Sequence, residues 1–234
     1  MNLIYDEELI RAKLYDFHSS LRVNLSDEFF TVSAVLFSII PYEDRSYDLV
    51  LIQRTNRGRN HRGEMSFPGG RFEKNVDRSV IDTALRETEE EIGVSRNEIE
   101  LLGCMNDFPT MTKYIITPIV GKIDAHSILV KEEKEVKEIV KIPINFFVNK
   151  RNFKEQAFKV ENEKFPIFYF NYYDDHTKNK YLIWGATAYM IVSFIERIYD
   201  YNMSKLELER FSVEKIRSIK EYIKYRKNIT QNIK

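Results

Sequence analysis

Three glutamates lie at helical spacing behind a glycine turn, and this arrangement constrains the chain more than any other feature. Residues 86–94 read Arg-Glu-Thr-Glu-Glu-Glu-Ile-Gly-Val, and Phe-Pro-Gly-Gly precedes them at residues 67–70. Glu87, Glu90 and Glu91 stand three and four residues apart, so a helix presents all three on one face. Like charges at this spacing repel and weaken a helix. A hard cation such as Mg²⁺, bound through oxygen ligands, would offset that cost.

The other side of the same segment predicts a helix anchored in a core. At about 100° per residue, one stripe collects Ile81, Ala84, Leu85, Thr88 and Ile92. The glutamates point away from this stripe, so we expect the acidic face to meet a cleft or solvent. Gly93 is expected to end the helix. An isolated run of glutamates is usually a plain solvated face, but the glycines and Arg86 around this run favour a metal site.

Charge balance and cysteine content limit the classes of protein to which this chain can belong. The 234 residues carry 36 Lys or Arg against 36 Asp or Glu, so no overall basic field attracts nucleic acid. Cys104 is the only cysteine, which excludes an intrachain disulfide and fits a reducing compartment. We expect Cys104 to be a small buried residue, not a nucleophile. The sequence has neither an apolar run of membrane-spanning length nor a signal-peptide pattern, so a cytoplasmic protein is expected.

Hydrophobic patterning predicts a chain in which strands and helices are mixed. Residues 55–66 are polar and basic, and a loop of this length inside a domain is usually functional. Residues 132–138 form a charge-rich stretch. Strands are expected over 31–40, 47–53, 99–105, 114–123, 157–160, 165–172 and 181–184, and helices over 6–16, 143–148 and 185–199.

The composition changes near the C-terminus, so we predict one domain over residues 1–201 and a basic helical extension over 202–234. The extension has nine Lys or Arg against four Glu, with Ile216, Ile219 and Ile223 at helical spacing. A solvated or self-packing helical tail is the favoured interpretation. A surface for nucleic acid or another anionic partner is the alternative.

The acidic helix and the glycine turn suit the hydrolysis of a diphosphate. Divalent cations neutralise phosphate oxygens and lower the pKa of a bound water, and carboxylates on successive helical turns can hold such cations. Glycines let the backbone approach a metal or a phosphate because they have no Cβ. Arg86 keeps its proton, so it can orient Glu90 or contact phosphate.

These residues resemble the signature of the Nudix hydrolases: Gly70, then Arg86-Glu87-x-x-Glu90-Glu91-x-Gly93-Val94. The resemblance implies an α/β (α+β) fold, an α-β-α sandwich around a mixed β-sheet. It implies that Glu87 and Glu91 bind Mg²⁺ or Mn²⁺ directly and that the Gly70 carbonyl is a further ligand. It also implies that Glu90 ligates a metal or positions water, and it makes Glu90 and Arg86 catalytic candidates.

A second, narrower match lies upstream, where residues 50–70 read VLIQRTNRGRNHRGEMSFPGG. This stretch resembles the coenzyme A diphosphatase branch of the family, with conservative departures at Val50, Ile52 and Thr55. Arginine forks bind phosphates well, which suits the 3′-phosphate of coenzyme A. Residues 117–121 and 183–188 also look like this branch. The candidate substrate-binding residues are Arg54, Arg59, His61, Gly63, Phe67, Gly69 and Gly70.

The resemblance implies an enzyme that cleaves coenzyme A or acyl-CoA. It also implies a homodimer, because dimers are common in this superfamily. The products would be 4′-phosphopantetheine or its acyl form and adenosine 3′,5′-bisphosphate. A Nudix hydrolase acting on ADP-ribose, a nucleotide sugar or a damaged nucleoside triphosphate is the alternative. A Nudix fold that binds a ligand or RNA without catalysis is a third hypothesis, and the intact glutamates argue against it.

Two positions remain open in the sequence. The general signature carries an acid eight residues before its arginine, where this chain has Arg78; Asp77, nine before, matches the coenzyme A branch instead. The general base of such enzymes is often a glutamate on a loop outside the signature. Glu135 and Glu138 are the candidates, and a plain charged loop is the alternative for either one.

Overall fold

The chain divides into two compact units. The computed structural model describes residues 3–43, 46–56, 63–110, 112–160 and 163–208. The first unit comprises Met1–Lys154 and Phe168–Met203, and the second comprises Glu155–Ile167 and Ser204–Lys234. Every candidate site residue that the structure describes belongs to the first unit.

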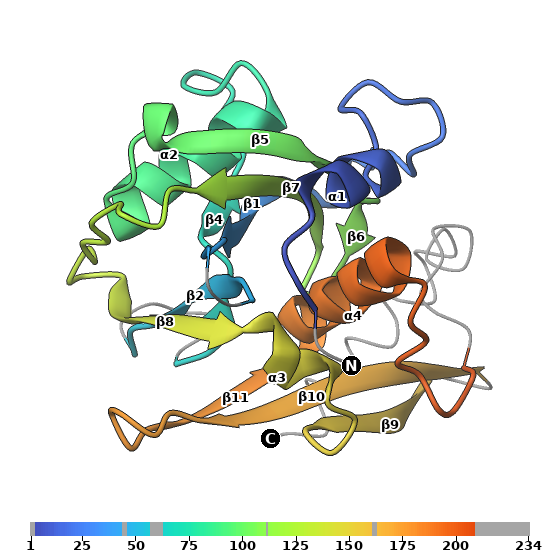
Figure 1. The fold of residues 1–234 in the computed structure, drawn as a ribbon. Coiled ribbons are helices and arrows are strands. Elements are labelled where there is room, and N and C mark those ends of the chain that lie inside the picture. The colour runs from blue at the N-terminus through green and yellow to red at the C-terminus, as the bar shows by residue number, and fades with distance from the viewer. Residues whose placement is uncertain (1–2, 44–45, 57–62, 111, 161–162, 209–234) are drawn as a thin grey trace. The chain divides into compact units, whose positions relative to one another are not determined.

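A mixed sheet forms the centre of the first unit (Figure 1). Its central strand β1 (Thr31–Ile40) pairs in parallel with β7 (Tyr114–Ile123) and antiparallel with β2 (Asp48–Arg54) and β4 (Gly69–Arg71). Apolar, β-branched residues dominate β1, as expected of a strand buried on both faces. The other described strands of this sheet are β3 (Met65–Ser66) and β8 (Val136–Pro143) on β2, and β5 (Ile99–Cys104) and β6 (Phe108–Pro109) on β7.

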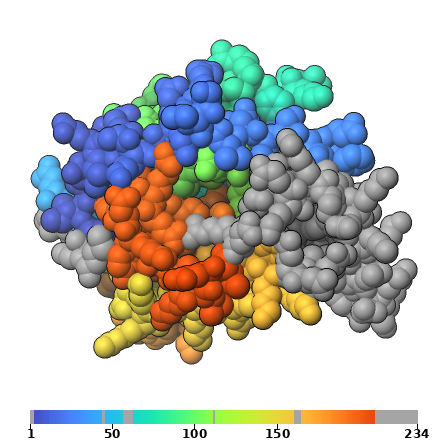
Figure 2. All heavy atoms as spheres, turned by 90° about the vertical axis from the view of Figure 1, so that its right-hand side faces the viewer, coloured from blue at the N-terminus to red at the C-terminus, as the bar shows by residue number. Residues whose placement is uncertain are grey.

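Alternate residues of β1 enter two different hydrophobic clusters, so the sheet is covered on both faces. Leu36 lies in the cluster that includes α2 (Val80–Ile92), whereas Phe37 lies in the cluster that includes α1 (Glu7–Lys13), α3 (Ile144–Val148) and α4 (Gly185–Tyr199). Figure 2 shows the blue N-terminal region beside the orange region of α4, and α1 contacts α4. The predicted α-β-α sandwich around a mixed sheet is confirmed.

Local signals set both ends of α2. The Ser79 side chain accepts a hydrogen bond from the Asp82 N–H at 3.2 Å, which satisfies one of the free donors of the first turn. Gly93 adopts a left-handed conformation with φ +71°, and its N–H donates to the Glu89 carbonyl. The predicted end of the helix at Gly93 is therefore confirmed.

A second, three-stranded sheet has the order β11 (Lys180–Trp184), β10 (Glu163–Tyr173) and β9 (Phe153–Val160). Phe168 and Phe170 of β10 are buried, so these aromatic side chains belong to the core. In the second unit, Glu155 accepts a hydrogen bond from the Ser204 hydroxyl at 2.7 Å. Residues 202–208 contain no helix, and residues 209–234 lie outside the described part, so the helical extension stays a prediction there.

Cys104 is 1% exposed, and its thiol contacts the carbonyls of Tyr15 and Asp16 at 3.6 and 3.7 Å. Burial raises the pKa of this thiol to about 11, so little thiolate forms at neutral pH. We expect Cys104 in the folded protein to react with a thiol reagent at least about tenfold more slowly than in the unfolded chain. Timed labelling with and without denaturant measures this, and equal rates would contradict the buried, unreactive assignment.

Candidate active site

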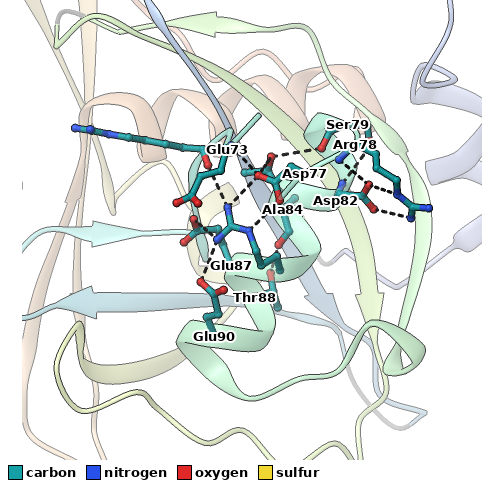
Figure 3. A network of polar contacts seen from close by, with 12 residues as sticks. Glu73, Asp77, Arg78, Ser79, Asp82, Ala84, Glu87, Thr88 and Glu90 are labelled. Atoms are coloured by element: carbon teal, nitrogen blue, oxygen red, sulfur yellow. Dashed lines mark hydrogen bonds and ion pairs between the residues drawn. The ribbon is translucent and has the colours of Figure 1, made fainter. Parts of the chain in front are cut away.

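Arg86 is the centre of a polar network that joins Asp77, Glu87 and Glu90, which are labelled in Figure 3. Its Nε and Nη2 donate to the two carboxylate oxygens of Asp77 at 2.9 and 3.1 Å. Its Nη1 donates to Glu87 at 2.8 Å and to Glu90 at 3.0 Å, and Nη2 also donates to the Arg71 carbonyl at 3.2 Å. A guanidinium has five N–H donors, and these five contacts use all of them. Of the two roles predicted for Arg86, these contacts support the orientation of carboxylates, and the contact with phosphate stays a prediction.

Asp77 is the buried anchor of this network. Its side chain is 1% exposed, and it also accepts hydrogen bonds from the Glu73 N–H and the Thr83 hydroxyl, both at 2.9 Å. The hydrogen bonds from Arg86 are the main reason why the pKa of Asp77 falls to about 2. Asp77, which is shifted by one residue relative to the general signature, thus still pairs with Arg86. No sequence pattern pointed to Thr83, whose hydroxyl donates the remaining hydrogen bond to Asp77.

Glu91 is buried, which corrects the expectation that all three glutamates share an open face. Its side chain is 3% exposed, against 58% for Glu90 and 15% for Glu87. The Gly69 N–H donates to one carboxylate oxygen of Glu91 at 2.9 Å, and the Arg54 Nη1 contacts the other at 3.1 Å. Helical spacing placed the three residues on neighbouring turns correctly. It could not show that the glycine turn and β2 close over the last of them.

Burial makes the carboxylates on this face harder to ionise. It raises the pKa of Glu91 to about 7, although the charge of Arg54 and the Gly69 hydrogen bond oppose the shift. The pKa of Glu87 is also raised, mainly by burial. Two desolvated carboxylates side by side are costly unless positive charge compensates them.

The glycine turn brings the backbone against these carboxylates. A Cβ at Gly69, where φ is +156°, would lie 2.4 Å from the Ala34 carbonyl oxygen, and one at Gly70 would lie 2.3 Å from a carboxylate oxygen of Glu87. Only glycine allows both approaches. Phe67 is 1% exposed, and its ring lies 4.3 Å from that of Phe37. The expectation that Phe67 contacts substrate is therefore wrong for this structure, because Phe67 supports the turn from the core.

The two candidate bases lie on different faces of the sheet. In β8, Glu138 pairs with Gln53, whereas Val136 pairs with Arg54, so the register shifts by one residue at Lys137. Cross-strand partners share a face. Val136 packs in the cluster that includes α2, so its partner Arg54 lies on the α2 side of the sheet. Gln53 precedes Arg54 and points to the opposite face, so its partner Glu138 also lies on that opposite face. There, the Asn179 side chain donates to the Glu138 carboxylate at 3.3 Å.

Glu135, just before β8, is exposed, and its charge raises the pKa of both Glu87 and Glu91. Glu135 therefore lies within electrostatic reach of the acidic face of α2, whereas Glu138 is not among the main causes of either shift. Residues 132–138 also correct a sequence interpretation, because the second half of this charged stretch forms the start of β8. A charged strand edge hides the alternation on which strand prediction depends.

The basic loop is described at its two ends. Arg54 ends β2 and reaches Glu91, while Gly63 adopts φ +68° and its carbonyl accepts a hydrogen bond from the Gln53 side chain at 3.4 Å. Arg59 and His61 lie outside the described residues, so their predicted contacts with substrate stay predictions.

Comparison with known proteins now decides the family. A family model described as NUDIX domain matches residues 32–157, which is more than half of the chain. The chain belongs to the Nudix family. The matched span contains the glycine turn, the Nudix helix α2 and the turn that carries Glu135.

Two relatives with similar sequences agree with this assignment. An uncharacterized Nudix hydrolase, NudL, from Pectobacterium atrosepticum is 29% identical over 168 residues, which cover 72% of this chain and 83% of that protein. NudL from Photorhabdus laumondii is 30% identical over 150 residues, 64% of this chain and 76% of that protein. Among solved structures, a MutT/nudix family protein from Enterococcus faecalis has a TM-score of 0.46 at 16% identity and covers 88% of this chain and 80% of that chain.

The protein is therefore a Nudix hydrolase that acts on diphosphate bonds, and such enzymes generally use divalent metal ions. Within the described ranges, no group of three or more His, Cys, Asp or Glu side chains has the arrangement of a metal site. Arg86 holds Glu87 and Glu90, and Arg54 holds Glu91, so arginine charge compensates the carboxylates here.

None of the described helices is long and apolar enough to cross a membrane.

The residues nevertheless fit a divalent cation. Carboxylate and carbonyl oxygens are the ligands that Mg²⁺ and Mn²⁺ prefer. The structure brings the Glu87 carboxylate against the backbone of Gly70, and it buries Glu91 one helical turn further along. An ionised carboxylate has about four lone-pair sites, so Glu87 and Glu91 can keep their arginine contacts and still bind a cation.

Proposed function

We propose that this Nudix hydrolase cleaves the diphosphate of coenzyme A or acyl-CoA to 4′-phosphopantetheine, or its acyl form, and adenosine 3′,5′-bisphosphate. The contact between Arg54 and Glu91 at 3.1 Å carries the proposal. It joins the first arginine of the upstream motif at residues 50–70 to the acidic helix. The motif that resembles coenzyme A diphosphatases therefore lies, at Arg54, directly beside the carboxylates that are expected to bind the metal.

Glu87, Glu91 and the Gly70 carbonyl would hold Mg²⁺ or Mn²⁺, with the more exposed Glu90 at the edge of the site. When bound, the cation neutralises the diphosphate and lowers the pKa of the attacking water. Arg86 fixes the directions of Glu87 and Glu90 through the contacts described above. Glu135 is placed to take a proton from that water, because it lies on the same side as α2 and remains exposed.

The basic loop from Arg54 to Gly63 would bind the remaining phosphates. Arg54 is 32% exposed, so its guanidinium is open to a ligand on one side while it contacts Glu91 on the other. Arg59 and His61 would contribute further contacts. Arginine forks that hold phosphate oxygens make charge-assisted hydrogen bonds, which are stronger than neutral ones. This loop would distinguish coenzyme A from nucleotides that lack a 3′-phosphate.

The proposal is tested by incubating the full chain with coenzyme A and Mg²⁺ or Mn²⁺ and separating the products by chromatography. We expect equal amounts of adenosine 3′,5′-bisphosphate and 4′-phosphopantetheine. We also expect a kcat/KM about tenfold or more above that for dephospho-coenzyme A, since one lost charged contact changes a free energy by about 1.4 kcal/mol or more. If ADP-ribose or a nucleoside triphosphate is cut and coenzyme A is not, the substrate assignment fails and the enzyme class remains.

A further inference from the structure

The turn at residues 132–135 is attached to the end of α2. The Glu132 N–H donates to the Glu91 carbonyl at 3.0 Å, and the Val130 N–H donates to the Ile92 carbonyl at 2.9 Å. The last carbonyls of a helix have no partner within the helix, and here this segment supplies the partners. The backbone that precedes Glu135 is therefore fixed to the same helix that carries Glu87 and Glu91.

Thr55 holds the same turn from the other side. Its N–H donates to the Glu135 carbonyl and its hydroxyl to the Lys134 carbonyl, both at 2.8 Å. The Glu132 carboxylate closes the turn by accepting from the N–H groups of Lys134 and Glu135 at 2.9 and 3.0 Å. Thr55 directly follows Arg54, which contacts Glu91. Consecutive residues at the end of β2 thus hold both acidic parts of the site.

We propose that Thr55 is a positioning residue for the catalytic reaction: its hydroxyl and N–H clamp the 132–135 turn so that the Glu135 carboxylate stays beside the acidic face of α2. The inference rests on the proposed role of Glu135 as general base. Glu135 is exposed and no buried packing fixes it, so the hydrogen bonds of its turn determine where its carboxylate lies. Misplacing a catalytic group by about 1 Å can cost about 10²-fold in rate, whereas substrate binding would change little.

The test compares Thr55→Val, which removes the hydroxyl at nearly constant shape, with Thr55→Ser, which keeps it. We expect Thr55→Val to lower kcat about tenfold with KM for coenzyme A within about twofold of the wild type. Thr55→Ser should restore kcat to within about twofold. Thr177→Val is the matched control, because its hydroxyl accepts from the Asn179 N–H at 3.4 Å in the turn between β10 and β11. We expect this control to keep wild-type kinetics.

Glu135→Gln separates positioning from a general effect. It should lower kcat about 10²-fold or more, and adding Thr55→Val to it should change kcat no further, because nothing is left to position. An additional loss in the double variant, or a Thr55→Val enzyme with wild-type kcat, would overturn the inference. Wild-type kcat in Glu135→Gln would overturn it together with the assignment of the base. If the enzyme cuts a different nucleoside diphosphate, the same variants are measured on that substrate, so failure of the coenzyme A proposal is seen separately.

Discussion

Glu91→Gln is expected to lower kcat about 10³-fold, since losing one anionic metal ligand removes roughly 4 kcal/mol of transition-state stabilisation. The substitution keeps the shape of the side chain but removes the charge and replaces the oxygen that faces Arg54 by an NH2 donor. Glutamine keeps a side-chain oxygen that can accept the Gly69 N–H bond, which is 2.9 Å long in the structure. It loses the negative charge that attracts both a cation and Arg54. Because the buried carboxylate is itself costly to ionise, the variant should fold at least as well as the wild type when no metal is added.

Steady-state kinetics with coenzyme A and calorimetric titration with Mn²⁺ would check this result. Glu89→Gln is the control. Glu89 is exposed on the same helix, so this substitution removes the same charge outside the site. We expect the control to keep kcat within about twofold. Turnover by Glu91→Gln at the wild-type rate would remove the metal-site hypothesis altogether, whatever the substrate.

Sequence patterns predicted most long elements of the fold because each is set by its own residues, but they missed the eight-residue strand β8. The strand at 114–123 was predicted with the bounds of β7, and α2 ends at the expected Gly93. The short strands β3, β4 and β6 were missed because two or three residues carry no period. These strands form only because they pair with β2, β1 and β7. A local sequence pattern does not predict pairing between segments that are distant in the chain.

The same limit applies to the site. Spacing alone placed Glu87, Glu90 and Glu91 on adjoining turns, but the burial of Glu91 depends on the glycine turn, which lies over 20 residues earlier in the chain. The choice between Glu135 and Glu138 depends on the register shift at Lys137, and a shift of one residue reverses the face of every later side chain. Such a shift is a property of two paired strands.

Asp77 illustrates how the structure assigns a role that the sequence left open. It accepts both forks of Arg86 and two further hydrogen bonds, and its side chain is 1% exposed. Arg86 in turn holds the directions of Glu87 and Glu90. The register of the acid in sequence therefore matters less than its distance from the guanidinium, and an acid nine residues before the arginine reaches it.

Asp77→Asn should consequently reduce both stability and activity. We expect the free energy of unfolding at pH 7 to fall by about 2 to 3 kcal/mol, because removing one partner of a buried ion pair leaves the other charge poorly compensated. The estimate lies at the low end for such pairs because Arg86 is 17% exposed and keeps its contacts with Glu87 and Glu90. Denaturant titration followed by fluorescence measures the loss. We also expect kcat to fall about tenfold as Arg86 loses its anchor.

The pH dependence of stability gives a second, independent test of the pair between Asp77 and Arg86. The folded-state pKa of Asp77 is lowered from 3.8 to about 2, so its contribution is complete above the unfolded-state pKa and is lost as pH falls through the folded one. Between pH 4 and 2 the wild type should lose more stability than Asp77→Asn. Asp82→Asn is the matched control, because Asp82 also pairs with two arginines, Arg78 and Arg96, which are 84% and 47% exposed. The Asp82 carboxylate is only 12% exposed, but both of its arginine partners lie open to solvent, which screens these pairs and makes them weaker than the Arg86 pair. A control as damaging as Asp77→Asn would therefore show that burial of the Arg86 pair is not what stabilises α2.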